Sequence, residues 1–585
     1  MVVQVTESMC QDVTASTDRG VPGHSETQLI GAKSISSIVT LYGSIGKAHA
    51  GQYGRLYRGS PMPRDSKSND PTTPPVAGQA TFTRRKVLQL AGWVLAGTFL
   101  PSVTRLAARP LFDLSFAPQA ETRADYPISE VMTRLSSYMC QARSQELPGE
   151  VIERAKRHIL DTFGAMVSGS ELPAGRAALR FAREYGGKPV STIVGDTVLC
   201  GPIEAALANA VMAHADESDD HMMGISYHPG NSSVPAALAV GEQFSTSGMH
   251  FLRAVVLGYD IGGRVLRTVQ SGLDVHKSTF ALAGVFGATA AAACSASLTD
   301  QQMRWSLSYA AQQCSGLAAT FPRDLDHIEK GFDFAGMPAR SGVTAAELVH
   351  AGWNGVNDIM SGPDNFLLAS FPAANPATLI DQLGEHFYMM DAGIKRWTAG
   401  GPSQEPLYAM EALLQRHPVD PDQVQEVILR AVRGHDNNTD NGGWPDLNVQ
   451  YLLALMLIDK KVTFQTIHDK ARMQDPAILA LRQKVRLEPG FPGRRDPQIQ
   501  ITLKDGTRLV QEDVQTYFQI PLASEQVVAK ARDLMTPVIG DAAVSRLIEC
   551  LLDLEKVKDI HELRPLLQWT SPPGPPRLSQ YPYAR

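Results

Sequence analysis

From Tyr126 onward, apolar residues recur every three or four positions, which is the spacing of one face of an α-helix. Glycines and polar residues separate one run from the next, as helix ends require. The Ala-rich run Ala281–Ala296 is typical of a helix packed closely among other helices. The pattern predicts a helical domain over residues 126–390, with helices near Ile128–Ala142, Pro148–Val167, Ala174–Tyr185, Pro202–Ala213 and Gly248–Val269.

After about Asp391 the pattern changes to an alternation of apolar and polar residues, which is typical of strands. Asp505 and Gly506 are a hairpin turn signal between two such runs. Helical spacing returns near Ser524. The fold class expected is therefore mainly α with an α+β second domain. We expect the α+β domain over residues 391–525 and C-terminal helices over residues 526–585 that return to the helical domain.

The front of the chain follows neither pattern. Residues 1–80 are rich in Ser, Thr, Gly and Pro, which predicts a disordered extension. Arg84 and Arg85 then precede the apolar run 87–100, which is too short to span a bilayer but matches the core of a signal peptide. We expect residues 81–125 to be a twin-arginine-type signal and linker. The mature chain would then be periplasmic or secreted without a membrane span, or cytoplasmic if the signal does not function.

Composition narrows the function classes. The chain is 43% apolar and carries a formal charge of −6, which favours a globular protein and disfavours a nucleic-acid partner. Its six cysteines form no CxxC pair, which disfavours a zinc ribbon, an iron–sulfur cluster or a disulfide framework. We expect no cofactor, and an anionic substrate would have to be held by locally placed cations.

The densest group of charges follows the helix predicted over Pro202–Ala213, and an apolar run that starts at Val234 comes after it. Rigid helices commonly present functional groups on such loops. On residue types alone the loop could bind a divalent metal, act as an acid–base site, or be a solvated turn. The candidate residues in it are Glu217, Asp219, Asp220, His221 and His228.

Two further segments place cations or imidazoles near predicted helix starts. His276 and Ser278 precede an apolar helix, where they could hold a carboxylate or where Ser278 could simply cap the helix. Lys330 and Arg340 flank several Gly and Pro residues, which predict a turn instead of a simple helix and bring the two cations near it. Either cation could clamp a carboxylate, although a solvated Lys is equally consistent with the sequence.

The α+β domain supplies the last candidates. Lys395 and Arg396 stand before a glycine-rich turn that enters a helix, which suits a carboxylate clamp at the domain boundary better than a phosphate loop. Tyr451 begins another helix, and its phenol could protonate a carbanion or simply pack in a core.

Taken in order, these segments resemble the MmgE/PrpD family, which includes 2-methylcitrate dehydratases, cis-aconitate decarboxylases and iminodisuccinate epimerases. No single motif is decisive, but the ordered series is specific and runs from about residue 126 to 540. The matching stretches are Leu160–Gly164, Ala213–Asp220 with His228 and Pro229, Gly258–Ile261 with Arg264, the His276 segment, Phe334–Gly342 and Asn448–Tyr451.

The resemblance implies a cofactor-independent homodimeric enzyme, with a large helical domain, a smaller α+β lid domain, and the pocket between them. It implies that Glu217, Asp220, His228, His276 and Tyr451 are catalytic, and that Lys395 is the lid lysine. Two positions depart from the family pattern. The lysine expected before the Gly336 segment would fall at Gly331, so Lys330 is one residue out of register. Gly400 stands where cis-aconitate decarboxylases place a histidine.

We therefore expect a lyase or isomerase acting on a small di- or tricarboxylate such as 2-methylcitrate, with dehydration as the simplest reaction. A histidine would take a proton next to a carboxylate. The substrate-binding residues expected are Lys330, Arg340, Lys395, Arg396 and Ser278. The alternatives are a decarboxylase or epimerase of the same family, an exported non-catalytic carboxylate-binding protein, and a metal-dependent hydrolase.

Overall fold

The computed structural model describes residues 126–569, except for 223, 319–325, 432–438, 470, 492–496, 513 and 517–518. The extension expected over 1–80 and the signal expected over 81–125 lie outside the described residues, as do positions 570–585 of the predicted C-terminal segment.

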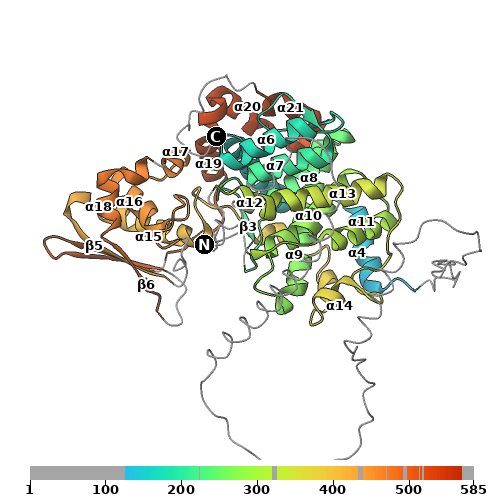
Figure 1. Cartoon of the computed structure of the whole chain (residues 1–585), viewed down its shortest axis with the longest axis horizontal. Coiled ribbons are helices and arrows are strands. Elements are labelled where there is room, and N and C mark those ends of the chain that lie inside the picture. The colour runs from blue at the N-terminus through green and yellow to red at the C-terminus, as the bar shows by residue number, and fades with distance from the viewer. Residues whose placement is uncertain are drawn as a thin grey trace, which may run out of the picture. The chain divides into compact units, whose positions relative to one another are not determined.

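Long helices make up the first part of the described chain, as the periodicity predicts (Figure 1). Several begin or end where the sequence signals lie: Thr299 caps the helix that follows it through a capping box, and Pro202 opens another. These helices are α4 (Glu130–Gln141), α5 (Gly149–Gly169), α6 (Pro173–Tyr185), α7 (Pro202–Ala213), α8 (Gly230–Gln243), α9 (Gly248–Val269), α10 (Thr279–Ser295), α11 (Asp300–Gln313) and α13 (Met337–His350).

Helix α10 is buried on nearly all of its faces and packs against α8, α9, α11 and α13. Its alanines and glycines allow this close packing. A Cβ atom at Gly287 would lie 2.8 Å from the carbonyl oxygen of Gly258 on α9, which leaves no room for a side chain. Two core helices therefore cross with their backbones close together.

The segment 328–350 departs from the expectation. A turn was predicted between Lys330 and Arg340, but the chain is helical throughout, so that prediction is wrong. The helix accommodates Pro338 by a π-helical stretch, η3 (Phe332–Gly336), between α12 (Ile328–Gly331) and α13. A proline removes a helical hydrogen bond, and a π-bulge is one way to absorb the disruption.

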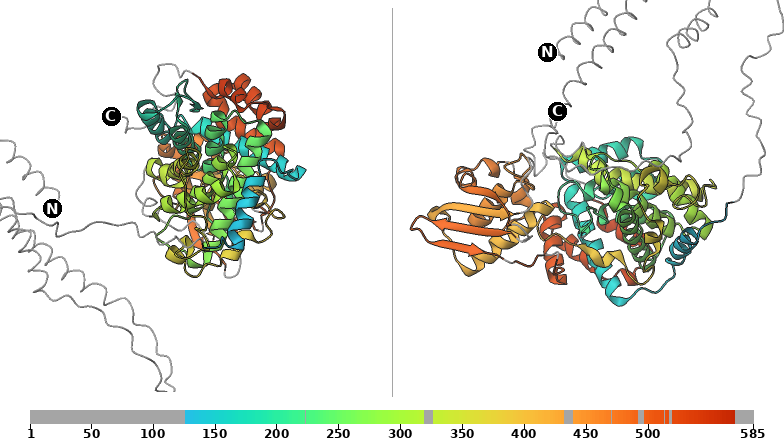
Figure 2. Two further views of the ribbon diagram at one scale, coloured as in Figure 1. Left: turned by 90° about the vertical axis from the view of Figure 1, so that its right-hand side faces the viewer. Right: turned by 90° about the horizontal axis from the view of Figure 1, so that it is seen from below.

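A four-stranded sheet of order β6-β5-β7-β8 forms the centre of the α+β part. Strand β5 (Val424–Ala431) pairs parallel with β6 (Val485–Pro489) and antiparallel with β7 (Gln498–Leu503), which forms a hairpin with β8 (Arg508–Gln511) through Asp505 and Gly506. Helix α15 (Gly401–Arg416) packs against β7 and β8, and α16 (Val449–Asp459) packs against α15 and α18 (Pro476–Arg482) (Figure 2).

Shorter elements connect these parts. Helix α17 (Phe464–His468) belongs to the α+β part, and α19 (Ser524–Ile539) and α20 (Asp541–Leu552) come after the sheet and pack against α5. The remaining pieces are β1 (Ser191–Thr192) with β2 (Leu199–Cys200), β3 (His221–Met222) with β4 (Ala392–Gly393), α14 (Phe366–Ser370), α21 (Arg564–Leu567) and short 3-10 turns.

The buried apolar side chains fall into two clusters. One joins the helices of residues 132–394 with Phe464 and with 522–567, and the other runs from Trp397 to Ile501. The expected fold class, mainly α with a smaller α+β part, is confirmed. The precise domain boundaries stay a prediction. Within the described residues, no helix is both long and apolar enough to cross a membrane.

Candidate active site

The loop 214–229 joins two apolar helices, and its residues 214–220 and 227–229 are buried. Helix α7 ends at Ala213 and is capped by His214, whose amide donates back to Ala210, and α8 begins directly after Pro229. Both helices are core helices, so the loop between them is drawn into the interior with its side chains. Buried charges need partners, and the surrounding contacts supply them.

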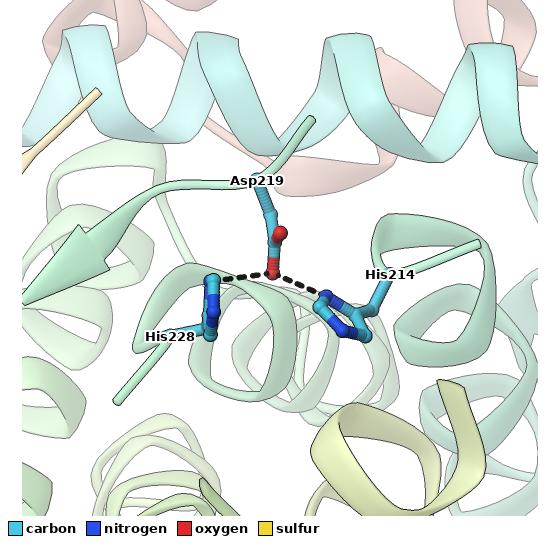
Figure 3. Close-up of side chains that lie close together, drawn as sticks. All are labelled: His214, Asp219 and His228. Atoms are coloured by element: carbon cyan, nitrogen blue, oxygen red, sulfur yellow. Dashed lines mark hydrogen bonds and ion pairs between the residues drawn. The ribbon is translucent and has the colours of Figure 1, made fainter. Parts of the chain in front are cut away.

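Asp219 is the centre of the first group of contacts (Figure 3). Its Oδ2 atom lies 2.9 Å from His214 Nδ1 and 3.3 Å from His228 Nδ1. The Asn231 amide donates to the same oxygen at 2.9 Å. Burial on its own would raise the pKa of Asp219, but His214, His228 and Lys395 hold that pKa well below its usual value, so the carboxylate is ionised.

These contacts fix which nitrogen of each histidine carries the proton. His228 Nδ1 lies 2.5 Å from the carbonyl oxygen of Asp220, and because a carbonyl only accepts, Nδ1 is the donor. In its neutral form His228 therefore has its lone pair on Nε2. Burial, opposed by Asp219, lowers the pKa of His214 to about 3, so His214 is neutral. Its Nε2 lone pair faces the Lys330 ammonium at 2.9 Å.

Two buried lysines from distant segments meet Glu217. Lys330 Nζ donates to Glu217 Oε1, and Lys395 Nζ lies 3.2 Å from Oε2 and 3.0 Å from the Glu217 carbonyl oxygen. Burial on its own would raise the pKa of Glu217, but the two ammonium groups outweigh it and hold the pKa well below its usual value. Burial would likewise lower the pKa of Lys395, yet Glu217 and Asp219 raise it. Glu217 and Lys395 are therefore both charged in the folded chain.

The π-helical stretch explains how Lys330 reaches this group although it is one residue out of register with the family pattern. Met337 donates its amide to Phe332, five residues earlier, whereas an α-helix bonds residues four apart. One π-turn therefore absorbs one extra residue. The side chain of Lys330 is 3% exposed, and its ammonium also lies 4.8 Å from the centre of the Phe334 ring.

Asp220 anchors the second half of the loop. Its Oδ2 atom accepts from Tyr259 OH at 2.7 Å and lies 2.6 Å from His158 Nδ1, while Oδ1 accepts from the Gly230 amide at the start of α8. Burial lowers the pKa of His158 despite Asp220, so this ring is neutral and donates from Nδ1. His158 and Tyr259 were not predicted as site residues. The sequence could have indicated them, because His158 lies beside the family stretch Leu160–Gly164 and Tyr259 lies within Gly258–Ile261.

Lys530 on α19 is a third lysine that meets the loop 214–229, and no sequence signal pointed to it. Its ammonium donates to the Ser218 carbonyl oxygen at 2.6 Å and pairs with Asp161 at 2.6 Å. Burial raises the pKa of Asp161 to about 7, even though Lys530 opposes the shift. The C-terminal helix α19 thus holds the backbone of the loop in place.

Three predicted residues on the helical part lie away from this group. The side chain of His276 is exposed, and its backbone pairs with Asp274 and Ala318. Ser278 is buried and caps α10 by accepting from the Ala281 amide. Arg340 is exposed on α13.

Two predicted residues on the α+β part also point elsewhere. Arg396 pairs with Glu411 at 2.8 Å and stacks on Trp397. Tyr451 donates its phenol to the Thr466 carbonyl oxygen at 2.7 Å and is part of the second hydrophobic cluster. Of the predicted site residues, the structure brings together Glu217, Asp220, His228, Lys330 and Lys395.

A metal ion fits this arrangement poorly. His214, Asp219 and His228 each offer an atom within 4.8 Å of the others, as three metal ligands would. However, both Nδ1 atoms already donate hydrogen bonds to oxygen, and the Lys395 ammonium lies 3.6 Å from Asp219. A divalent ion would have to displace these protons and sit beside two buried ammonium groups, which Coulomb repulsion opposes.

The sequence of the chain is similar to that of known proteins across both the helical part and the α+β part. A sequence pattern for the MmgE/PrpD N-terminal domain matches residues 133–378, and one for the MmgE/PrpD C-terminal domain matches residues 397–556. The chain is 27% identical to the cis-aconitate decarboxylase of Homo sapiens over 460 residues, which cover 73% of this chain and 92% of that protein.

Fungal relatives give a similar result. A cis-aconitate decarboxylase of Aspergillus terreus is 23% identical over 477 residues, covering 75% of this chain and 96% of the relative. A cis-aconitate decarboxylase-like protein of Aspergillus oryzae is 25% identical over 482 residues, covering 75% and 98%. Because the two domain patterns together span most of the described residues, the chain belongs to the MmgE/PrpD family.

Proposed function

We propose that this protein is a lyase that acts on a small di- or tricarboxylate without a bound cofactor. The observation that carries the proposal is the orientation of His228, whose Nδ1 donates to the Asp220 carbonyl and so leaves the lone pair of the ring on Nε2, beside a network with two buried lysines. The similarity to cis-aconitate decarboxylases supports a small tricarboxylate as the substrate class.

The residues have distinct parts in the reaction. Lys330 and Lys395 supply fixed positive charge, which stabilises the enolate-like negative charge that develops beside a substrate carboxylate. His228 Nε2 is the base, and Asp220 orients it by accepting from Nδ1 through its backbone carbonyl. Glu217 and Asp219 balance the lysines until an anionic substrate enters.

Two reactions are compatible with this set of groups. In a dehydration, His228 takes a proton from carbon, the electron pair forms a carbon–carbon double bond, and the hydroxyl leaves as water after gaining a proton. In a decarboxylation no proton is taken from the substrate: the bond to a carboxylate carbon breaks, carbon dioxide leaves, and the carbanion takes a proton from a protonated side chain, a part that His228 could fill after gaining a proton from solvent. The relatives favour the second reaction, and the family resemblance alone leaves the first open.

Proton NMR in deuterated buffer tests the proposal. The full chain is mixed in turn with cis-aconitate, 2-methylcitrate, citrate and related carboxylates. New vinyl signals with loss of carbon dioxide identify a decarboxylase, and new vinyl signals with release of water identify a dehydratase. Line broadening of a ligand without conversion contradicts the proposal and favours a carboxylate-binding protein.

Two further expectations from the sequence stay predictions. A homodimer is expected from the family resemblance, and sedimentation of the purified chain checks it. Export through the twin-arginine route is expected from Arg84, Arg85 and the apolar run 87–100. Replacing both arginines with lysine should retain the protein inside a host cell, as fractionation would show.

A further inference from the structure

His327 is a buried histidine that the proposed chemistry has not used. It lies in the left-handed backbone region, with φ at 55°, directly before α12, the helix that carries Lys330. Non-glycine residues in this region are uncommon, and they persist where the surroundings hold them. Its ring packs 4.4 Å from the Trp444 indole, centre to centre.

The partner of His327 comes from the α+β part of the chain. His327 Nε2 lies 3.2 Å from Asp446 Oδ2, and both side chains are buried. Asp446 is itself fixed, because its carbonyl oxygen accepts from the Gly400 amide at 2.9 Å. The pair therefore joins two segments that are more than a hundred residues apart.

Neither ring nitrogen of His327 has a hydrogen bond to a residue that the structure describes, so the contact of Nε2 with Asp446 is an ion pair alone. Nδ1 is buried and makes no hydrogen bond with any residue that the structure describes. Buried polar atoms are nearly always bonded, so an exception requires a bound water or a functional reason. His327 also lines a small pocket of about 40 Å³. Ala215, the neighbour of His214, lines the same cavity.

The charges around His327 favour its protonated form. Burial on its own would lower the pKa of His327, but Asp446 and Glu217 outweigh this and raise it, while Lys330 opposes them. Burial would raise the pKa of Asp446, yet His327 and His468 lower it. Asp326 and His468 are the other titratable residues that line the cavity. His327 therefore differs from His214 and His158, whose pKa values are lowered.

We propose that His327 and Asp446 form the proton-donating dyad of the reaction, with Asp446 holding Nε2 and with Nδ1 giving the proton. The inference rests on the proposed function, since it assigns the acid that complements His228 as the base. In a decarboxylation, the N–H bond breaks as a C–H bond forms on the carbanion. In a dehydration, the same proton forms an O–H bond on the leaving hydroxyl, which departs as water. The neutral imidazole then takes a proton back from solvent.

The first test is kinetic and uses the full chain with the carboxylate that the NMR panel identifies. His327→Gln should lower kcat by about 10²–10⁴-fold, the usual contribution of a general acid, with little change in KM. The wild-type rate should fall at alkaline pH as the imidazolium loses its proton, and this fall should be absent in His327→Gln. Asp446→Asn should move the fall to lower pH, because the carboxylate that favours the protonated ring is lost.

His417→Gln is the matched control, because His417 is an exposed histidine at the end of α15. It should keep the wild-type rate and pH profile. A His327→Gln variant within twofold of the wild-type kcat, or with an unchanged pH profile, would overturn the proposal.

The second test needs no substrate and separates the dyad from the proposed function. In nitrogen-15 NMR of histidine-labelled protein, the signal lost in His327→Gln identifies the His327 ring. That ring should keep its second proton to a higher pH in the wild type than in Asp446→Asn. If no carboxylate is converted, the proposed function fails while this readout still tests the pair, and the same titration of His327 in both proteins would overturn the dyad.

Discussion

Two segments of this protein place a histidine before an apolar helix, and they differ in what encloses them. The loop 214–229 lies between α7 and α8 and is buried, so His228 is only 5% exposed. The segment 273–278 precedes α10 alone, and His276 is exposed. A loop that connects two core helices is buried together with its charged side chains. A segment that precedes a single helix can remain exposed to water.

The difference extends to the partners of the two segments. The buried loop gathers three lysines from distant parts of the chain, Lys330, Lys395 and Lys530, because its carboxylates would otherwise be uncompensated. The exposed segment is held mainly by backbone contacts, in which Ser278 donates to Gly316 and Ala318 donates to His276. Both segments contain a histidine, so residue type does not distinguish them. The loop 214–229 is identified as the site because its charges are buried and are compensated by lysines.

Replacing His228 or His276 singly with glutamine should give the largest difference between the two segments. His228→Gln should lower kcat by about 10²–10⁴-fold, because the general base is removed. His276→Gln should stay within about threefold of the wild type, since its side chain is in solvent and general-base catalysis is not lost. The rates are measured by the NMR assay, with circular dichroism to check folding. A larger loss in His276→Gln would move the site to the other segment.

The adjacent residues Lys395 and Arg396 provide a comparison of buried and partly exposed cations. Lys395→Met leaves Glu217 and Asp219 under-compensated in the interior, which should cost about 3–5 kcal/mol of unfolding free energy. Arg396→Met breaks the partly exposed pair with Glu411 and the stacking on Trp397, and should cost no more than about 2 kcal/mol. Urea unfolding of both variants measures the costs, and equal costs would contradict the enclosed network.

The pH dependence of stability sharpens the description of the buried loop. His214 has its pKa lowered to about 3 by burial, so stability falls as pH falls below 6.5, where the unfolded chain takes up a proton. Asp161 has its pKa raised to about 7 by burial, so the folded chain binds the extra proton between pH 3.8 and 7, and stability falls as pH rises through that window. The two residues oppose each other between pH 4 and 6.5.

Asp161→Asn removes one of these two opposing effects. Its unfolding free energy should rise more steeply with pH than that of the wild type between pH 4 and 6.5, by up to about 1.4 kcal/mol per pH unit. Urea unfolding at several pH values measures the slope. Asp422→Asn, at an exposed carboxylate, should keep the wild-type slope. Equal slopes in wild type and Asp161→Asn would contradict the buried, proton-binding state of Asp161.

Removal of metal should have the smallest effect. The lysines beside Asp219 and His214 disfavour a divalent ion, so dialysis against a chelator should change turnover by less than about twofold. Recovery of lost activity by zinc or manganese would instead make His214, Asp219 and His228 a metal centre.

Much of the fold could be predicted because periodicity and caps are local signals. Helices α7 and α9 occupy the predicted ranges Pro202–Ala213 and Gly248–Val269, and β7 and β8 meet at the predicted Asp505–Gly506 turn. The segment after Lys330 was harder, because Pro338 and the neighbouring glycines indicate a turn. The chain instead absorbs the proline in one π-turn, which no local propensity describes.

The site was predictable only as far as its residues cluster in the sequence. Glu217, Asp220 and His228 are close together along the chain, so their density was visible. Lys530 lies more than three hundred residues away, and only the packing of α19 on α5 brings it to Ser218. Tyr451 shows the reverse, because its helix start was predicted but the direction of its phenol, to Thr466, depends on tertiary packing.

The most direct measurement is calorimetric binding of tricarballylate, an unreactive tricarboxylate, to the wild type, Lys330→Met and Arg340→Met. Lys330 is buried in the network around Glu217, and Arg340 is exposed ten positions later in the same helical segment. The account predicts that Lys330→Met binds at least about tenfold more weakly, the loss of about 1.4 kcal/mol, while Arg340→Met binds like the wild type. Unchanged affinity in Lys330→Met, or a loss confined to Arg340→Met, would contradict the buried network as the carboxylate site.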